Sequence, residues 1–362
     1  MKVLHIIDSL GLGGAQTVVR GIFEAQRDDK DIFLFVLRKR DITVEIKHPN
    51  FVIFNSIKKY SFKPLFDLKD LIKKEKISIL HCHLFRSQIS GYLLKRIWFP
   101  DIKLLFHEHG EIFQGHNFYN LFIKLSKKYV DQYIAVSNVT KEKIVKIAKV
   151  LPTKIIVLPN FIDLKKFNKD NILWDVEEEK AKIGIKKEEF VIGFVGRLEQ
   201  VKGCEYLIKA LPLLNFAYKV LIVGQGSQKK ILENLAVNLG ISDKIIFVGY
   251  LKNVIMIYSL LDTLVVPSVS ESFGLSVVEA QSMGVPVVAS GSSGLVEIIK
   301  DNENGLLFKV QDPVDLAKKI KLVKDEVLLS DTILKNALES VKKYCFEKYL
   351  NNLNMIYENE RT

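Results

Sequence analysis

Runs of apolar residues rich in Val, Ile and Phe recur along the chain and alternate with stretches of helical periodicity. In the first part these runs are nearly continuous, which is typical of strands in a parallel sheet that helices cover on both faces. Helical patterns, such as those at residues 117–129 and 139–149, lie between most of the runs. The alternation predicts a doubly wound α/β domain. Its predicted strands are residues 2–7, 32–37, 51–55, 77–82, 102–106, 132–136 and 154–158.

A polar and charged stretch at residues 160–189 interrupts this pattern. We interpret it as the linker between two domains, together with its flanks. A second series of apolar runs follows, again separated by helical patterns, and predicts a second doubly wound domain. The chain is therefore expected to form two Rossmann-like domains, at residues 1–165 and 166–345. The strands of the second series are residues 190–196, 219–224, 244–249, 263–268 and 285–290.

The last segment, residues 346–362, carries an apolar stripe at helical spacing. We expect a final amphipathic helix there, and such a helix needs an apolar surface to cover. The stripe consists of Phe346, Leu350, Leu353 and Tyr357.

The composition agrees with two soluble domains. A length of 362 residues, of which 48% are hydrophobic, suffices for two cores. The first apolar run is short and broken by Asp8, so we interpret it as a buried strand and not as a signal peptide. No run of eighteen apolar residues occurs in the sequence. The three cysteines, Cys82, Cys204 and Cys345, are far apart and fit a reducing, cytoplasmic compartment.

The net charge of +11 comes from the first half of the chain. Residues 1–166 contain 29 Lys and Arg against 16 Asp and Glu, whereas the remainder contains 24 against 26. This imbalance indicates an anionic partner for the first half, such as a membrane surface. Segment 58–76, with seven lysines and an apolar face, fits a basic amphipathic helix at a lipid interface. It equally fits an ordinary helix against a sheet. We expect no nucleic-acid partner, because no known binding module is present.

Glycines follow several predicted strands, where they permit tight turns and let a phosphate approach backbone amides. Any α/β protein also places glycine there, so each loop alone is weak evidence for a phosphate-binding site. The dinucleotide fingerprint is incomplete, because Gln16 and Lys229 stand where its third glycine should be. A nicotinamide oxidoreductase is therefore disfavoured. The glycine loops are GLGGAQ at 11–16, GFVGR at 193–197, VGQG at 223–226 and VGYL at 248–251, so Gly196 and Gly224 each end a predicted strand.

The segment GRLEQVKG at 196–203 places two cations, Arg197 and Lys202, on a loop and the start of a helix. Cations are unfavourable at a helix N-terminus because they face the positive end of the helix dipole. No protein partner for Lys202 is evident from the sequence. We therefore expect an anion there, such as a diphosphate held by the guanidinium fork and the ammonium.

The segment ESFGLSVVEAQSMGVPVVAS at 271–290 contains two carboxylates eight residues apart, Glu271 and Glu279. On one continuous helix they would be about 12 Å apart along the axis, too far to flank one glycosidic bond as a hydrolase pair. We expect Glu271 in a loop and Glu279 one or two turns into the following helix. One carboxylate would then reach a sugar and the other a ribose diol, with the helix N-terminus facing phosphate.

Taken in order, these motifs resemble those of the family-four retaining glycosyltransferases of the GT-B fold, of the bacterial or archaeal cell-surface glycan type. The resemblance covers nearly the whole chain and implies an active site in the cleft between the domains, with the last helix crossing back to the first domain. The motifs that carry it are GGAQ at 13–16, HEHG at 107–110, AVSN at 135–138, LPNFID at 158–163, GRLEQVKG, VGQG, SESFGLSVVEA at 270–280, GVPVVAS at 284–290, SSGLVEII at 292–299 and NGLLF at 304–308.

The resemblance implies roles for residues of the second domain. Arg197 and Lys202 would bind the donor diphosphate, and Glu279 would hold the ribose hydroxyls. Glu271 would hold the transferred sugar. Three backbone amides would help it, those of Phe273, Gly274 and Leu275.

Further roles follow in the same way. Gly13 and Gly14 would close on the phosphates, Tyr250 and Leu251 resemble the base-binding turn, and His109 matches the histidine that ends a central strand. Gln16 stands where the family usually has an acidic residue. The expected donor-binding set is Gly13, Gly14, Gln16, Gly196, Arg197, Lys202, Gly224, Tyr250, Leu251, Phe273, Gly274, Leu275 and Glu279, and the expected catalytic set is His109, Glu271, Arg197 and Lys202.

A metal site is the alternative for the histidines. His81, His83, His107 and His109 end two neighbouring predicted strands, and four imidazoles could bind zinc. Members of the family generally work without metal, so we expect neither a metal nor a cofactor. The one Asp-x-Asp sequence, at 29–31, precedes a strand and is expected to be a solvated turn.

The resemblance thus implies a retaining transfer of a sugar from a nucleotide sugar, UDP by family frequency, to a glycan or lipid-linked acceptor in surface polysaccharide synthesis. We expect the enzyme in the cytoplasm or peripherally on the inner face of the cytoplasmic membrane. Two other classes stay open. One is a GT-B epimerase or phosphorylase, and the other is a catalytically silent partner subunit.

Overall fold

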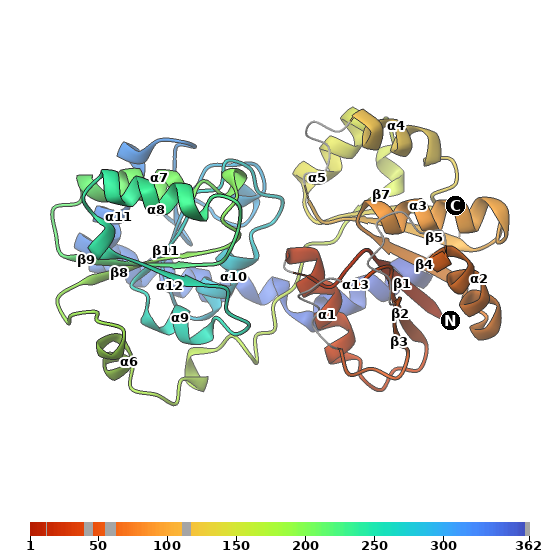
Figure 1. The fold of residues 1–362 in the computed structure, drawn as a ribbon, viewed down its shortest axis with the longest axis horizontal. Coiled ribbons are helices and arrows are strands. Elements are labelled where there is room, and N and C mark those ends of the chain that lie inside the picture. Colours follow the sequence, from red (N-terminus) through yellow and green to blue (C-terminus); the bar gives the residue numbers. More distant parts are fainter. Residues whose placement is uncertain (12, 40–45, 55–62, 111–116, 359–362) are drawn as a thin grey trace. The chain divides into compact units, whose positions relative to one another are not determined.

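The computed structural model describes residues 1–11, 13–39, 46–54, 63–110 and 117–358, and the chain divides into two compact units (Figure 1). Unit 1 comprises Met1–Asn160 and Tyr349–Thr362, and unit 2 comprises Phe161–Lys348. Each unit has one parallel sheet flanked by helices, so the predicted fold class of two doubly wound domains is confirmed.

The sheet of unit 1 has seven parallel strands in the order β3-β2-β1-β4-β5-β6-β7. Strand order reverses between β1 and β4, because β1 pairs with β2 on one side and with β4 on the other. The strands are β1 (Val3–Ile7), β2 (Ile32–Val36), β3 (Phe51–Ile53), β4 (Ile79–His83), β5 (Lys103–Glu108), β6 (Gln132–Ala135) and β7 (Ile155–Val157). The helices are α1 (Gly14–Ala25), α2 (Lys63–Glu75), α3 (Phe85–Ile97), α4 (Asn117–Ser126), α5 (Asn138–Lys143), continued as one π-turn (Ile144–Ala148), and α13 (Phe346–Glu358).

The two faces of this sheet differ in chemistry, because successive residues of a strand point to opposite faces. On one face lies an aliphatic and aromatic core, which includes Ile6, Leu80 and Phe106 together with side chains of α2, α3 and α4. On the other face the central strands place histidines, and α1 and α13 cover them: His5 packs edge-on against Phe23 of α1.

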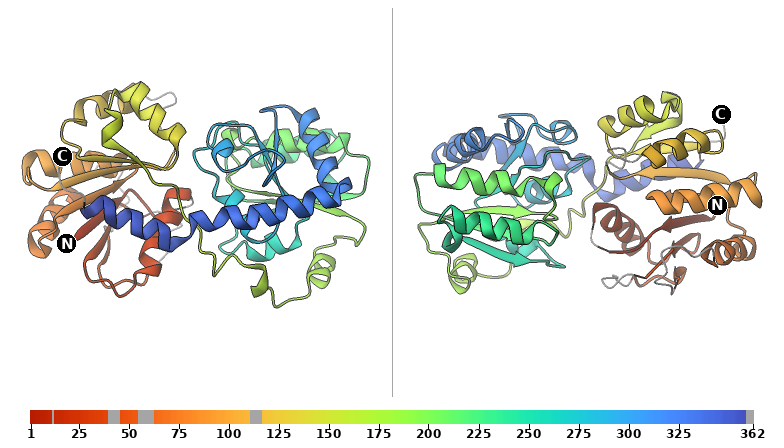
Figure 2. Two further views of the ribbon diagram at one scale, coloured as in Figure 1. Left: turned by 180° about the vertical axis from the view of Figure 1, so that it is seen from behind. Right: turned by 45° about the horizontal axis from the view of Figure 1, so that its top comes forward.

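The last helix, α13, belongs to unit 1 from Tyr349 onward. Figure 2 shows this helix, in blue, beside the early strands of that unit. The hydroxyl of Tyr357 reaches His81 of β4, and the ammonium of Lys103 donates to the carbonyl oxygens of Ile356 and Tyr357. The predicted return of the helix to the first domain is confirmed. Its buried face differs from the predicted stripe, since Phe346 and Leu350 are only half-buried. The buried residues are Tyr349, Leu353, Ile356 and Tyr357.

The sheet of unit 2 has six parallel strands in the order β10-β9-β8-β11-β12-β13, and the order reverses between β8 and β11. The strands are β8 (Phe190–Val195), β9 (Tyr218–Val223), β10 (Ile245–Gly249), β11 (Thr263–Val266), β12 (Val287–Ser290) and β13 (Leu306–Phe308). The helices are α6 (Val176–Lys182), α7 (Cys204–Ala210), α8 (Lys229–Asn238), α9 (Ile255–Leu260), α10 (Leu275–Ser282), α11 (Pro313–Asp325) and α12 (Val327–Val341).

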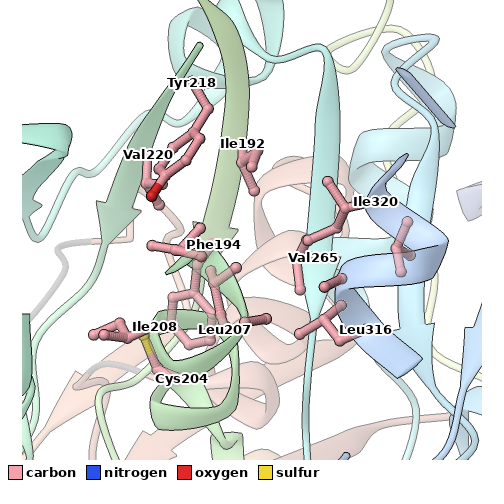
Figure 3. Packing of buried hydrophobic residues seen from close by; sticks show 14 of the residues in the cluster. Ile192, Phe194, Cys204, Leu207, Ile208, Tyr218, Val220, Val265, Leu316 and Ile320 are labelled. Atoms are coloured by element: carbon pink, nitrogen blue, oxygen red, sulfur yellow. The ribbon is translucent and has the colours of Figure 1, made fainter. Parts of the chain in front are cut away.

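Strand side chains interlock with helices on one face of this sheet to form the core (Figure 3). Ile192, Phe194 and Val265 point toward Leu207 of α7 and Leu316 of α11. On the opposite face α9 lies against β8, and α10 lies against β11. These helices hold the carboxyl ends of β8 and β11 at one edge of the sheet.

Two local features were not predicted. Strand β13 lies within the NGLLF motif, and its three residues are too short for a periodic signal. Helix α6 lies within the segment interpreted as a linker, where an Asp175 side chain accepts hydrogen bonds from the amides of Glu177 and Glu178. This is a side-chain cap of the kind that begins a helix.

Leu353→Ala is expected to lower the free energy of unfolding of unit 1 by about 2–4 kcal/mol, because it empties a fully buried site beneath α13. Urea denaturation followed by fluorescence of Trp98 measures this, in a Trp174→Phe background that removes the only other tryptophan. Met355→Ala on the same helix is the control, since Met355 is exposed, and about 0.5 kcal/mol or less is expected. Equal effects of the two substitutions would contradict the packing of α13 on this unit.

Candidate active site

The candidate site of unit 2 lies where strand order reverses, at the carboxyl ends of β8 and β11. Open parallel sheets bind ligands at such points, because the loops on either side diverge there. The loop after β8 carries Arg197 and Lys202, and the loop after β11 carries Glu271. Residues 69 positions apart in the chain thus meet at one edge of the sheet.

Lys202 and Glu271 form an ion pair, with 2.5 Å between the ammonium Nζ and the carboxylate Oε2. Both side chains are largely shielded from water, and Ser268 donates a further hydrogen bond of 3.3 Å to the same oxygen. The expectation that Lys202 has no protein partner is therefore wrong. Glu271 could not be predicted as this partner from the sequence, because the contact depends on β8 and β11 being neighbours in the sheet.

The backbone of the β11 loop is fixed from the side of β12. The amide of Gly294 donates to the carbonyl oxygen of Glu271 at 2.9 Å, and the Ser293 hydroxyl donates to the same oxygen at 3.3 Å. A Cβ on Gly294 would lie 2.5 Å from the carbonyl oxygens of Glu271 and Ser272. Only glycine permits this approach, so the carboxylate of Glu271 stands on a rigid loop.

Helix α10 begins directly after this loop, and Gly274 precedes it with a φ of 97°, in the region that favours glycine. The first amides of a helix have no partner inside it, so the amide of Leu275 is available at the positive end of the helix dipole. Phe273 is buried and packs edge-on against Tyr344. Its side chain therefore anchors the loop, while its backbone remains at the sheet edge.

Glu279 lies in the second turn of α10, as the sequence indicated, and is half-buried. The hydroxyl of Tyr258 on α9 donates to its Oε2 at 2.7 Å. Burial raises the pKa of Glu279 to about 7, although the Tyr258 hydrogen bond and the charge of Lys166 act in the opposite direction. The carboxylate is thus held in one orientation and changes its protonation state near neutral pH. Tyr258 has no sequence signal that would mark it as the partner of Glu279.

The glycine loops after β8 and β9 cross in close contact. Gly224 has a φ of 140°, and a Cβ there would lie 1.8 Å from the carbonyl oxygen of Gly196. Arg197 follows Gly196 and is exposed, with Glu199 near enough for their charges to interact. Ser227 holds Glu199 through its amide and its hydroxyl, which orients the loop that carries both predicted cations.

Tyr250 and Leu251 follow β10 at the far side of this edge. Gly249, with a φ of 82°, turns the chain there, and Tyr250 is exposed. The structure therefore places the predicted donor-binding residues of unit 2 in loops or helix starts at the carboxyl edge of its sheet, with Glu279 one turn further into α10.

In unit 1 the predicted glycines occupy the turn between β1 and α1. Gly13 precedes the helix, and Gly14 is its first residue. The carboxamide of Gln16 folds back over Gly13, since its Oε1 lies 2.4 Å from the place a Cβ would take on Gly13. The residue that departs from the family pattern therefore lies directly against this turn.

His109 follows β5 and is half-buried. Its Nε2 lies 2.9 Å from Nδ1 of His83, and burial lowers the pKa of His109 to about 3, against an opposing effect of Asn160. His109 is therefore neutral at physiological pH. His83, His107 and His109 do lie together, and His5, which the sequence analysis missed, joins His81 and His83 in a second such group.

Comparison with known proteins gives two family matches. Residues 175–339 match the model of the glycosyl transferases group 1, and residues 12–166 match that of glycosyltransferase family 4. An uncharacterized glycosyltransferase of Methanocaldococcus jannaschii is 31% identical over 336 residues, which cover 85% of each chain. The chain belongs to the family 4 glycosyltransferases.

Relatives of this glycosyltransferase also occur in bacteria. The UDP-Gal:alpha-D-GlcNAc-diphosphoundecaprenol alpha-1,3-galactosyltransferase of Escherichia coli is 27% identical over 309 residues, covering 81% of this chain and 76% of that one. Among solved structures, Anabaena HepE in complex with UDP and glucose superposes with a TM-score of 0.86 over 99% of this chain and all of the other, at 19% identity. This likeness confirms the GT-B fold.

Gly224→Ala is expected to destabilise unit 2 by about 3 kcal/mol or more, because the new Cβ forces the β8 and β9 loops apart. Gly240→Ala is the matched control, since Gly240 also has a positive φ but has no atom within 4 Å of its Cβ position, and about 1 kcal/mol is expected there. Urea denaturation followed by Trp174 fluorescence, in a Trp98→Phe background, compares them. Equal losses would show that the loops do not cross as described.

Proposed function

We propose that this glycosyltransferase moves a sugar from a UDP-sugar to a glycan or a lipid-linked acceptor, with retention of anomeric configuration. The observation that carries the proposal is the meeting of Lys202, Glu271 and the N-terminus of α10 at the sheet edge of unit 2. The relatives support the donor, since one is named for a UDP-galactose donor and one neighbour holds UDP and glucose.

The site can stabilise the departing diphosphate by electrostatics. Two cations, Arg197 and Lys202, and the first amides of α10, which have no partner within the helix, can supply positive potential at this edge of the sheet. Glu271 orients the ammonium of Lys202 in advance, so little rearrangement is needed when charge develops on the leaving group. Lys202 then serves the phosphates and Glu271 the hydroxyls of the transferred sugar.

Glu279 is proposed to accept hydrogen bonds from the ribose diol. Its hydrogen bond from Tyr258 fixes the carboxylate and leaves its other oxygen for a ligand. Tyr250 and Leu251 are assigned to the base, and Gly196 and Gly224 to the close approach of the phosphates. Gly13, Gly14, Gln16 and His109 of unit 1 are assigned to the same reaction from the family resemblance. No metal is assigned a part in it.

The acceptor is proposed to be lipid-linked, as the name of the Escherichia coli relative states for that enzyme. In the described part of the chain every helix is too short or too polar to span a bilayer. We propose peripheral attachment on the cytoplasmic side through α2. The apolar face predicted for lipid, which includes Leu65, Leu68 and Ile72, is instead packed in the core, so attachment rests on lysines and on exposed Phe66. The residues 58–62 of the predicted segment lie outside the described residues.

Lys202→Ala is expected to lower kcat by about 100-fold or more while the fold is kept, since a charge-assisted contact to the leaving group is lost. Lys230→Ala, at an exposed lysine on α8, is the control and is expected to leave kcat unchanged. Mass and NMR analysis of the products reports transfer and anomeric configuration. Retained kcat would remove the phosphate role. A product without a new glycosidic bond would favour an epimerase or phosphorylase, and no turnover with bound donor would favour a silent subunit.

Glu279→Gln is expected to raise the KM for the donor about tenfold to a hundredfold, as a charged acceptor of two hydroxyls becomes neutral. The wild-type KM is expected to fall as pH rises through about 7, because the raised pKa keeps Glu279 protonated below that value. Glu279→Gln should lose this pH dependence. Steady-state kinetics from pH 6 to 8 tests both statements. A sugar phosphate lacking the nucleoside that served equally well would contradict the assignment.

The protein is expected to sediment with vesicles that contain anionic lipid at low salt, and not with neutral vesicles. Replacing Lys69, Lys73 and Lys74 by alanine should weaken binding roughly a hundredfold, because each lysine near an anionic surface contributes about 1 kcal/mol. Replacing Lys318, Lys321 and Lys324 on α11 of unit 2 is the matched control. Equal and negligible binding to both kinds of vesicle would make a soluble acceptor the better proposal.

A further inference from the structure

Five histidines lie together on one face of the unit 1 sheet. They come from three neighbouring strands: β1 supplies one, β4 two, β5 one, and the fifth follows β5 directly. The register places His5 opposite His81 and His83 opposite His107, which puts them on the same face. Four of them are completely or almost completely buried, and the fifth is half-buried. They are His5, His81, His83, His107 and His109.

Hydrogen bonds join these imidazoles into one unbranched chain, with the Tyr357 hydroxyl of α13 as a link. The chain runs through six side chains in an order that uses each ring nitrogen no more than once. From one end to the other the contacts are His109 Nε2 to His83 Nδ1 at 2.9 Å, His83 Nε2 to His5 Nδ1 at 3.0 Å, His5 Nε2 to the Tyr357 hydroxyl at 3.2 Å, that hydroxyl to His81 Nδ1 at 2.7 Å, and His81 Nε2 to His107 Nδ1 at 3.1 Å.

Such a chain has a direction. A neutral imidazole has one N–H donor and one acceptor nitrogen, and a hydroxyl donates one hydrogen. Burial lowers the pKa of all five histidines, so each is neutral, and each link must have one donor and one acceptor. If one ring changes tautomer, every other ring must change with it or leave two donors or two acceptors face to face.

The ends of the chain decide the direction. Nε2 of His107 is buried and has no hydrogen-bond partner among the described residues. At the other end Nδ1 of His109 and Oδ1 of Asn160 are both buried, and neither has a partner elsewhere in the described structure. A proton on Nδ1 of His109 can satisfy that nitrogen and Asn160 at once. It also leaves His107 with an unpaired lone pair, which is tolerated better than an unpaired buried N–H.

We infer that His83, His5, Tyr357, His81 and His107 act as one unit of positioning residues that holds His109 in the tautomer with its proton on Nδ1. The inference rests on the proposed function only in giving His109 a part in the reaction. Nε2 of His109 is occupied as an acceptor from His83, and the proton on its Nδ1 is directed to Asn160. Neither ring nitrogen has a free lone pair in this tautomer, so His109 does not serve as a general base.

The same nitrogens fall into two groups of three that could hold a metal ion. All the ligand atoms in those groups are imidazole nitrogens. A metal ion would need each of these nitrogens without a proton, whereas every link of the hydrogen-bonded chain holds one proton. The hydrogen-bonded chain keeps the face of the sheet uncharged and uses the same contacts.

Histidine tautomers in the full-length protein labelled with 15N-histidine test the inference, because two-bond 1H–15N correlation spectra distinguish the protonated ring nitrogen from the bare one. In the wild-type protein all five rings are expected as single tautomers, with protons on Nδ1 of His109, His83, His5, His81 and His107. A proton on Nε2 of His109 overturns the inference. So does metal at one equivalent per chain, measured by mass spectrometry of the purified protein.

Coupling along the chain is tested with Asn160→Leu, which is similar in size but removes the acceptor. All five rings, including His107 at the far end, are expected to shift together to a mixture of tautomers. Asn160→Asp keeps the acceptor and should retain the wild-type pattern. In a Tyr357→Phe background Asn160→Leu should still change His109, His83 and His5 but no longer His107. Tyr349→Phe, on the same buried face of α13, is the control and should leave the coupling intact.

Two outcomes overturn the inference. One is a His107 tautomer that does not change in Asn160→Leu. The other is a His107 tautomer that changes equally in Asn160→Leu with and without the Tyr357 hydroxyl. Thermal melts of each variant show whether it is folded, and the wild-type spectrum alone still tests the direction if a variant does not fold. The kcat of His109→Ala is measured separately. A normal kcat of His109→Ala would show that His109 has no part in the proposed reaction. The tautomers measured in the wild-type protein would still stand.

Discussion

The ion pair between Lys202 and Glu271 exists because two strands far apart in the chain, β8 and β11, are neighbours where the order of the unit 2 sheet reverses. In a parallel sheet every carboxyl end points to one edge, so each loop there can contribute to one site. The glycines of these loops serve the same arrangement. Gly294 and Gly224 let backbones approach to distances that a Cβ would forbid, and the charged side chains stand on the resulting rigid edge.

Unit 1 meets a different constraint, which is how to bury polar side chains in the middle of a sheet. A buried polar group is costly unless it is hydrogen-bonded. The histidines of β1, β4 and β5 hydrogen-bond to one another, and Tyr357 of α13 joins them into one chain. The aliphatic face of the same sheet needs no such partner. Helix α13 is therefore tied to unit 1 by specific polar contacts in addition to its apolar face.

The sequence predicts much of the fold, because strands buried on both faces are legible as continuous apolar runs. The start of α10 and the positions of Glu271 and Glu279 could also be predicted, since a glycine and a change of period mark the helix. The side-chain partners that lie on other strands or helices could not be predicted. Whether Lys202 meets Glu271, or Tyr258 meets Glu279, depends on strand order and on helix placement, which one sequence does not display.

Local periodicity also misled in two places. The stripe predicted on the last helix is about an eighth of a turn away from the buried face, since Tyr349 and Ile356 are equally compatible with helical spacing. The apolar face of α2 is compatible with a lipid surface or with a protein core, and in the structure it packs in the core of unit 1. His5 cannot be assigned to the cluster from the sequence, because a lone histidine in a strand has no local signal. Only its register with His81 reveals the cluster.

The assignment of α13 to unit 1 has a consequence for the order in which the protein acquires its structure. Chains emerge from the ribosome N-terminus first, and domains generally fold as units. Strands β1 to β7 and α1 are synthesised early, yet α13, the second helix that covers their histidine face, follows the whole of unit 2. Unit 2 can therefore be complete while that face of unit 1 still lacks part of its cover. A nascent chain is exposed to non-native association on one known surface until its last helix has docked.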